Sequence, residues 1–353
     1  MRDESFHAVA FRLVPLGLLL ATAVAAAVAG AGWAERLAPL PWLVSLVVVG
    51  LPHGAADLAV TRRIGRGSVA RVFSIYVACV VAVFAMFMAA PVPLIVLFAA
   101  LSLWHFGMGH ADGQTPPIAV GFLPRARAAL ARGAPVLGVP LAVWPAETAA
   151  AIQGLVGLVG TSAQLLRARA AFAPETIRVV GQGLLVVGAV ALVAEVRATR
   201  GTPGALRRSG DTCVDLAVAA ALGTAMPPLL SIGLYFLMWH AWRHLGLLSP
   251  LVTGVEPRDG RSLWRALVRL HTAALPLLVP TWVVILAAWW WLSPEHSARD
   301  LALISLAVYL VVTPSHDMLV DLMRSRSDTG KHLSSPPTIA PPSCAARLAC
   351  SSS

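Results

Sequence analysis

Long apolar runs, separated by short polar loops that carry many arginines, fill the first 324 residues of the chain. Most runs are about 18–22 residues long, the length of a helix that crosses a hydrocarbon core of about 30 Å. A backbone in lipid must satisfy its own hydrogen bonds, so such runs predict α-helices. They are Leu13–Trp33, Pro41–Val60, Val72–Ala90, Pro91–Gly109, Ala134–Leu166, Val179–Val193, Leu216–Trp242, His271–Leu292 and Leu301–His316.

The run Ala134–Leu166 is too long for one span. We expect Pro140, Pro145 and Glu147 to interrupt it, so that it folds back as two spans, because proline breaks the helical hydrogen-bond ladder. The pattern thus predicts an all-α fold, a polytopic transmembrane helical bundle of about 8–10 spans. We expect residues 1–324 to form one integral membrane domain and the Ser- and Pro-rich residues 325–353 to form a disordered tail.

Composition supports a membrane protein and excludes a soluble one. The chain is 58% hydrophobic and 12% charged, with a mean hydropathy of +0.75, whereas soluble domains are about 45–50% apolar and about 25% charged. The net charge of +10 could suggest nucleic acid as a partner. Here the arginines lie in short loops between apolar runs, as in the cytoplasmic loops of membrane proteins. We therefore expect the partner of the chain to be the lipid bilayer and not a nucleic acid.

The distribution of loop arginines also predicts orientation. The loops after Val60, Gly109, Trp242 and His316 are rich in arginine, whereas those near Glu35, Pro91 and Glu295 are not. Positively charged loops stay inside, which predicts a multi-pass protein of the cell (inner) membrane with both termini in the cytoplasm. One loop contradicts this scheme, because it would lie outside; it contains Arg197, Arg200, Arg207 and Arg208.

Histidines are the ionisable residues that recur in or beside the apolar runs, and each intramembrane ionisable residue is a candidate functional group. With the predicted orientation they share a depth near the cytoplasmic side of the membrane. A single buried histidine is usually a helix–helix contact, but several at one depth favour a metal or haem site. The histidines concerned are His53, His105, His110, His240, His244, His271 and His316.

Spacing strengthens the metal interpretation. In WHAWRH, His240 and His244 are four residues apart and share one helix face, where both can bind one ion. Metal-bound imidazoles usually donate their second N–H to a carboxylate or carbonyl, and the nearby acids are Asp57, Asp112 and Asp317. Arg243 could instead pair with one of these acids. Imidazole suits Zn, Cu, Fe and Ni; an all-histidine site leaves positions open for dioxygen, and a site in the bilayer implies a lipophilic substrate.

Four short motifs resemble one known family. They are GLPHGAAD (Gly50–Asp57), WHFG (Trp104–Gly107), WHAWRH (Trp239–His244) and TPSH (Thr313–His316). In this order they resemble the bacteriorhodopsin-related-protein-like (Brp/Blh) β-carotene oxygenases. The chain departs from that family at Leu58, where members commonly have histidine. It also departs after the second motif, where members usually have an acidic residue soon after HFG and this chain continues with MGHAD.

The resemblance implies a membrane enzyme that cleaves the central 15,15′ double bond of β-carotene, or of a related carotenoid, with O2 to give retinal. It implies Fe(2+) as cofactor, held by His53, His105, His240 and His244, and a rhodopsin that receives retinal as a further partner. His316 matches the last motif without an assigned role. We expect other residues to line the substrate or orient the ligands: Asp57, Phe106, His110, Asp112, Trp239, Trp242 and Arg243.

Two other functions remain open from the residues. One is a membrane electron carrier whose histidines bind haem, which would give a Soret band; histidines four residues apart on one helix count against it. The other is a transporter that uses intramembrane histidines as gates and binds no metal. The sequence does not decide the oligomeric state.

Overall fold

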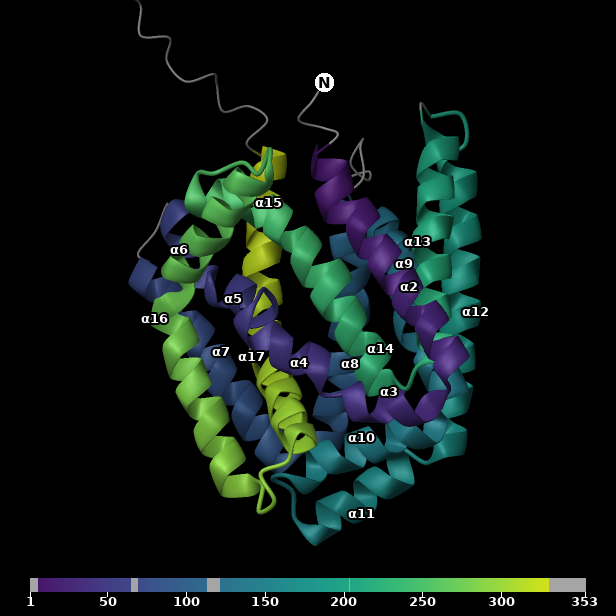
Figure 1. The fold of residues 1–353 in the computed structure, drawn as a ribbon, viewed down its shortest axis with the longest axis vertical. Helices are drawn as coiled ribbons and strands as arrows, with labels where there is room; N and C mark the ends of the chain where they lie inside the picture. Colours follow the sequence, from purple (N-terminus) through teal and green to yellow (C-terminus); the bar gives the residue numbers. More distant parts are fainter. Residues whose placement is uncertain (1–5, 65–68, 113–120, 203, 330–353) are drawn as a thin grey trace, which may run out of the picture.

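The computed structural model describes residues 6–64, 69–112, 121–202 and 204–329, and within these ranges the chain is helical (Figure 1). Eight helical stretches are long and apolar enough to cross a membrane, which confirms the all-α polytopic fold. The elements are η1 (Val9–Leu13), α2 (Val14–Ala29), α3 (Ala31–Leu37), α4 (Leu40–Val47), α5 (Gly50–Ala55), α6 (Asp57–Ile64), α7 (Val69–Ala89), α8 (Pro91–Asp112), α9 (Phe122–Val143), α10 (Pro145–Gly157), α11 (Ser162–Ala171), α12 (Pro174–Thr199), α13 (Ala205–Ala225), α14 (Pro228–Leu234), η2 (Tyr235–Ala241), α15 (Trp242–Thr253), α16 (Gly260–Leu292) and α17 (Ala298–Thr329).

The expected division of Ala134–Leu166 is only partly right. The helix does break at Trp144, between α9 and α10, where Pro145 begins the next helix. However, α10 has 13 residues and α11 has 10, which is shorter than the roughly 20 residues that a crossing needs. Both lie at one end of the bundle (Figure 1), so this run contributes one span and not two.

The prediction that Leu216–Trp242 forms a single span is wrong. Met226 is extended (φ −138°, ψ 147°) between α13 and α14, as expected for a residue before a proline. The chain reverses there, so that α13 descends and α14, η2 and α15 together climb back in Figure 1. Two antiparallel helical segments, divided at Met226, thus replace the single predicted span.

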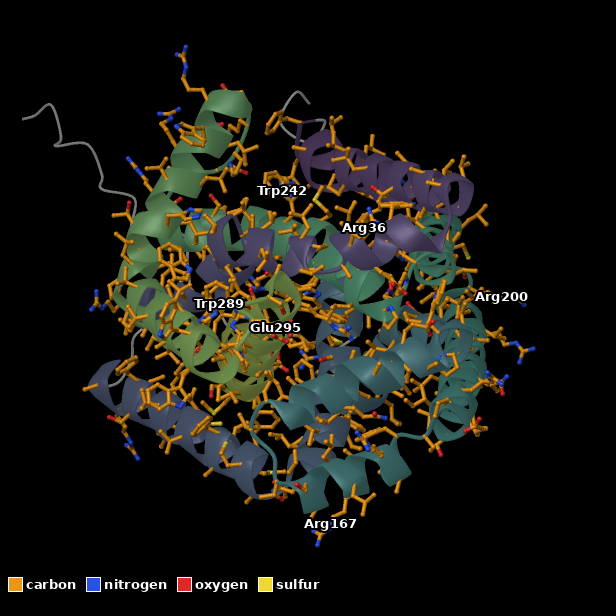
Figure 2. All side chains as sticks on the ribbon, turned by 60° about the horizontal axis from the view of Figure 1, so that its bottom comes forward. Arg36, Arg167, Arg200, Trp242, Trp289 and Glu295 are labelled. Carbon is orange, nitrogen blue, oxygen red and sulfur yellow. The ribbon has the colours of Figure 1, made fainter. Side chains whose placement is uncertain are left out.

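These two corrections explain the loop that contradicted the charge pattern. Because α10 and α11 do not cross, α12 rises from their end of the bundle and the α12–α13 connection lies at the same end as the N-terminus (Figure 1). The arginines of that connection therefore join the other arginine-rich loops. Figure 2 turns the opposite end toward the viewer and shows Arg167 and Glu295 there.

Residues 325–329, which were expected to belong to the tail, continue α17, and residues 330–353 lie outside the described residues.

Asp259 caps the N-terminus of α16, where its side chain accepts a hydrogen bond from the Ser262 backbone N–H at 2.6 Å. This hydrogen bond, together with that from the Ser262 hydroxyl, holds the pKa of Asp259 below its usual value.

Glycine allows α8 and α9 to approach closely. A Cβ atom at Gly107 would overlap the backbone of Ala129, and one at Gly133 would overlap the Leu103 carbonyl. Small residues are the usual means by which membrane helices come together, because van der Waals packing drives their association. This contact fixes the position of His105, which lies on α8 between Leu103 and Gly107.

A buried ion pair joins three helices on the other side of α9. The Arg132 guanidinium donates to both Glu195 oxygens of α12, at 2.6 and 2.7 Å, and to the Thr212 hydroxyl of α13 at 3.3 Å. The Arg132 side chain is 2% exposed and that of Glu195 is 14% exposed. Such a pair fixes the arrangement because neither charge can be left alone in an apolar interior.

We expect Glu195→Gln to destabilise the protein by about 3–5 kcal/mol, since it leaves the buried Arg132 charge uncompensated. Arg207→Gln removes a charge whose side chain is 89% exposed and should cost about 0.5 kcal/mol or less. Thermal unfolding of the purified variants in detergent measures both. Equal stability of Glu195→Gln and Arg207→Gln would contradict a structural role for the pair.

Candidate metal centre and substrate cavity

Five buried histidines from five elements converge in the bundle, and we call them the histidine cluster: His53 (α5), His105 (α8), His240 (η2), His244 (α15) and His316 (α17). The shortest separation between ring centroids is 4.4 Å, for His105 and His240. His316 lies 5.4 Å from both His53 and His105. The structure thus brings together the four histidines proposed from the sequence as metal ligands and adds His316 to them.

Hydrogen bonds fix the tautomer of His105. Its Nδ1 contacts a carboxylate oxygen of Asp317, which can only accept, so Nδ1 carries the proton of the neutral ring. The Nε2 atom of His105 then has a lone pair and accepts from Nε2 of His240 at 2.8 Å. One proton lies between two Nε2 atoms, and a cation in its place would meet two imidazole lone pairs.

His53 and His316 are held in the same tautomer. Nδ1 of His53 donates to the Val49 carbonyl at 3.0 Å, and Nδ1 of His316 donates to both oxygens of Asp57 at 3.0 Å. The Tyr76 hydroxyl also hydrogen-bonds Asp57. In both histidines Nε2 therefore carries the lone pair. Asp57, expected from its spacing to orient a ligand, orients His316 from across the bundle.

A π-helical segment places the remaining two histidines. Because η2 contains His240 and runs directly into α15, His240 and His244 stack with ring centroids 5.7 Å apart and an interplanar angle of 19°. Single-turn π-bulges occur often at functional sites, because they change the direction of side chains within an otherwise regular helix. The sequence predicted the shared face of this pair, although it did not indicate the π-helical turn.

His271 lies apart from the cluster and has a structural role. Its Nε2 lies 2.8 Å from the Val47 carbonyl, and Nε1 of Trp282 donates to the Leu46 carbonyl at 2.9 Å. Both carbonyls belong to the end of α4, where the helix is interrupted before α5. Side chains of α16 thus satisfy polar groups that the interruption exposes. The side chains of His110 and Asp112, two further candidates, lie outside the described residues.

An apolar cavity of about 270 Å³ adjoins the histidine cluster. His53, His105 and His316 form part of its wall, and the rest is mostly aromatic and aliphatic, including Trp42, Phe73, Phe98, Phe106, Phe236 and Tyr309. Phe106 lines this cavity as expected. Phe236 links the cavity to the cluster, since its ring stacks on His240 at 5.9 Å and on Trp42 at 5.9 Å.

Two of the expected lining residues face elsewhere. Trp242 donates to the Ala10 carbonyl at 2.9 Å and packs against Phe11, on the N-terminal helix side of the bundle (Figure 2). Trp239 is buried in the core beneath Arg243, whose guanidinium lies 4.5 Å from the ring centroid. Arg243 stacks on Trp239 because the two residues are four positions apart and share a helix face, which differs from the face of His240 and His244.

Several residues of the site carried no signal in the sequence. Trp42, Phe236 and Tyr309 lie on separate helices and look in the sequence like ordinary core residues. Ser45 joins two of them, because its hydroxyl donates to the Trp42 carbonyl at 2.6 Å and lies 2.8 Å from the Tyr309 hydroxyl. Asp317 was a candidate because it follows His316 directly. Its partner His105, more than 200 positions away, could only come from the fold.

The donor set fits a metal that prefers imidazole. As the side chains lie, no group of three or more His, Cys, Asp or Glu residues among those described has metal-binding geometry. The chemistry nevertheless matches: histidines with an Nε2 lone pair, and carboxylates or a carbonyl on Nδ1, are the arrangement that orients imidazole ligands. The site suits Fe, Cu, Zn or Ni.

We expect Gly50→Ala to destabilise the packing of α5 and Gly54→Ala to leave that packing intact. A Cβ at Gly50 would lie 2.5 Å from Ser45 Cβ and 2.9 Å from the Phe236 ring, whereas nothing lies within 4 Å at Gly54. Overpacking should cost Gly50→Ala about 1–3 kcal/mol, while Gly54→Ala should gain about 0.5 kcal/mol in helix stability. Thermal unfolding compares them, and a loss in Gly54→Ala as large as in Gly50→Ala would contradict the packing described.

Comparisons with known proteins identify the family of the chain. The chain is 28% identical over 303 residues to the protein called "Probable beta-carotene 15,15'-dioxygenase Blh" of Halobacterium salinarum, covering 82% of this chain and 84% of that protein. No solved structure matches. The family model for beta-carotene 15,15'-dioxygenase matches residues 44–324, a range that contains all five histidines of the cluster. The chain belongs to the beta-carotene 15,15'-dioxygenase family, the carotenoid-cleaving enzymes that form retinal.

Proposed function

We propose that this enzyme binds ferrous iron in the histidine cluster and cleaves the central double bond of β-carotene held in the adjoining apolar cavity. The observation that carries the proposal is the convergence of five imidazoles beside a cavity whose other walls are apolar. An apolar cavity suits a hydrocarbon polyene, and the histidines are the polar groups that it can meet there.

His53, His105, His240 and His244 are the proposed ligands, and His316 is the fifth imidazole of the set. When bound, iron supplies the activation of dioxygen. Asp317, Asp57 and the Val49 carbonyl keep three of these rings in the tautomer whose Nε2 can bind the metal. Neutral imidazoles leave the positive charge of the ion in place, and the two buried carboxylates offset that charge at short range.

The cavity orients the polyene. The aromatic rings of Trp42, Phe236 and Tyr309, with centroids 5.0–6.1 Å apart, can hold a flat conjugated chain and exclude water from it. Phe236 also stacks on His240, which supports a position of the chain beside the cluster. Correct positioning matters, since a displacement of about 1 Å can cost about 100-fold in rate.

The substrate would enter from the bilayer between α7 and α16. Val77 of α7 lines the cavity and is 41% exposed, while Leu277 and Thr281 of α16 line it and are half-buried. Both helices pack against α17, and their outward faces are apolar, as lipid contact requires. A carotenoid dissolved in the membrane can therefore reach the cavity without passing through water.

The corrected topology supports the orientation expected from the sequence, with both termini in the cytoplasm. The connections at the end of the bundle that holds α10 and α11 contain five arginines and five acidic residues: Arg36, Arg167, Arg169, Arg178, Arg299, Glu35, Glu147, Glu175, Glu295 and Asp300. Their charges cancel, so the whole excess of +10 belongs to the rest of the chain. By the positive-inside rule this distribution supports a cytoplasmic position for the end with the N-terminus and the close of α17.

Expression in bacteria that accumulate β-carotene tests the reaction. We expect carotene to disappear and retinal to form with the wild-type chain, and His240→Ala to abolish both retinal formation and bound iron. His296→Ala is the control, because its ring packs on Trp289 and Trp290 away from the cluster. Chromatography of the extracted pigments measures the outcome. Full retinal production by His240→Ala would refute the proposed site, and a Soret band in the purified protein would favour the haem carrier.

A second experiment tests the fifth histidine by metal content. We expect His316→Ala and Asp57→Asn to lower iron affinity by about 10–100-fold, because the first removes a donor and the second loses the anion that orients it. Asp300→Asn is a matched control, since Asp300 bonds Ser293 in a loop outside the cluster. Elemental analysis after dialysis against graded chelator gives the affinities. Unchanged affinity in His316→Ala would restrict the ligands to four.

A further inference from the structure

The cavity has a definite length, and its far end is formed by residues that the proposed function does not use. Along α17 the lining residues run from His316 back to Leu306, ten positions or about 15 Å at 1.5 Å per residue. Along α8 they run from His105 back to Phe98, about 10 Å. The two helices rise in the same direction (Figure 1), so the histidines stand at one end and Leu306 and Phe98 at the other.

Packed side chains close the far end. Phe98 and Val80 line the cavity and also pack against a buried apolar cluster that includes Phe87, Leu94 and Leu310. This cluster extends to α10 through Leu155 and Val156. A chain that enters beside the histidines and runs toward Leu306 therefore meets protein and not lipid.

The dimensions allow only part of a carotenoid inside. The polyene between the two terminal rings of β-carotene has about nineteen bonds, or about 23 Å at about 1.2 Å per bond in an extended chain, which is longer than the roughly 15 Å of cavity lining along α17. From the terminal ring to the central double bond the polyene has about nine bonds, or about 11 Å at about 1.2 Å per bond in an extended chain. With the ring added, this length matches the distance from the far end to the histidines.

We propose that Leu306 and Phe98 form a stop for one terminal ring of the substrate and thereby select the central double bond for cleavage. The inference rests on the proposed function and deepens it, because it names the residues that determine which bond reacts. Cleavage breaks one carbon–carbon double bond, and each of its carbons receives one oxygen atom of O2. The electrons balance without a further reductant, and two retinal molecules result when the broken bond is the central one.

Leu306→Ala tests the stop. Its shorter side chain lets the ring move deeper by about one double-bond repeat, two bonds or about 2.4 Å, which brings the neighbouring 13′,14′ bond to the histidines. The products there are an aldehyde two carbons longer than retinal and a ketone two carbons shorter. We expect the ratio of this pair to retinal to rise about tenfold or more, since one methylene is worth about 10–200-fold in discrimination.

Leu303→Ala is the matched control. Leu303 lies on the same helix and is buried, but it neither lines the cavity nor belongs to the cluster that closes its far end, so its truncation should leave retinal as the product. Purified iron-loaded enzymes, β-carotene in detergent and mass-resolved chromatography give the ratios. A retinal-only pattern in Leu306→Ala, or an equal shift in Leu303→Ala, would overturn the stop. If the wild type forms no retinal, the proposed function itself fails.

Binding to the metal-free protein gives a second readout that does not require turnover. Quenching of tryptophan fluorescence, to which Trp42 of the cavity wall contributes, reports retinal and the two-carbon-longer aldehyde separately. We expect wild type to bind retinal more tightly than the longer aldehyde and Leu306→Ala to reverse this preference. Leu306→Val serves if Leu306→Ala does not fold. An unchanged preference in the folded variant would also overturn the stop.

Discussion

Two buried carboxylate–imidazole pairs hold the site together. Asp317 of α17 contacts His105 of α8, and Asp57 of α6 contacts His316 of α17. Each pair joins helices that are distant in sequence, and neither carboxylate could stay in an apolar interior without its partner. The same contacts fix which ring nitrogen carries the proton. The same two contacts therefore join distant helices and leave Nε2 of His105 and of His316 with the lone pair that a metal ligand needs.

The helices that support the cluster are adapted to this requirement. Glycines on α8 and α9 allow the close packing that positions His105, and the interruption between α4 and α5 lets His53 enter the bundle while His271 and Trp282 satisfy the exposed carbonyls. The cavity then occupies the space that the aromatic residues leave below the rings. Irregular backbone at membrane depth is tolerated here because it is buried in protein.

The sequence predicted the class of fold and the histidines, because apolar length and intramembrane polarity depend on local composition. It did not predict the path of the chain through Ala134–Leu166 or Leu216–Trp242. The effect of Pro145 and Pro227 depends on whether the helices on either side pack beside each other, which only tertiary contacts decide. For the same reason Trp239 and Trp242 were expected in the cavity, although they face the core and the N-terminal helix.

One consequence of α17 concerns how the protein is made. This last of the described helices brings both His316 and Asp317, so the earlier helices contain His53, His105, His240 and His244 without the carboxylate that orients His105. Chains fold as they emerge, beginning at the N-terminus. The complete histidine cluster can therefore form only after α17 has inserted, and a chain interrupted during synthesis lacks the finished site. The order of the helices thus delays completion of the histidine cluster until the bundle that encloses it is complete.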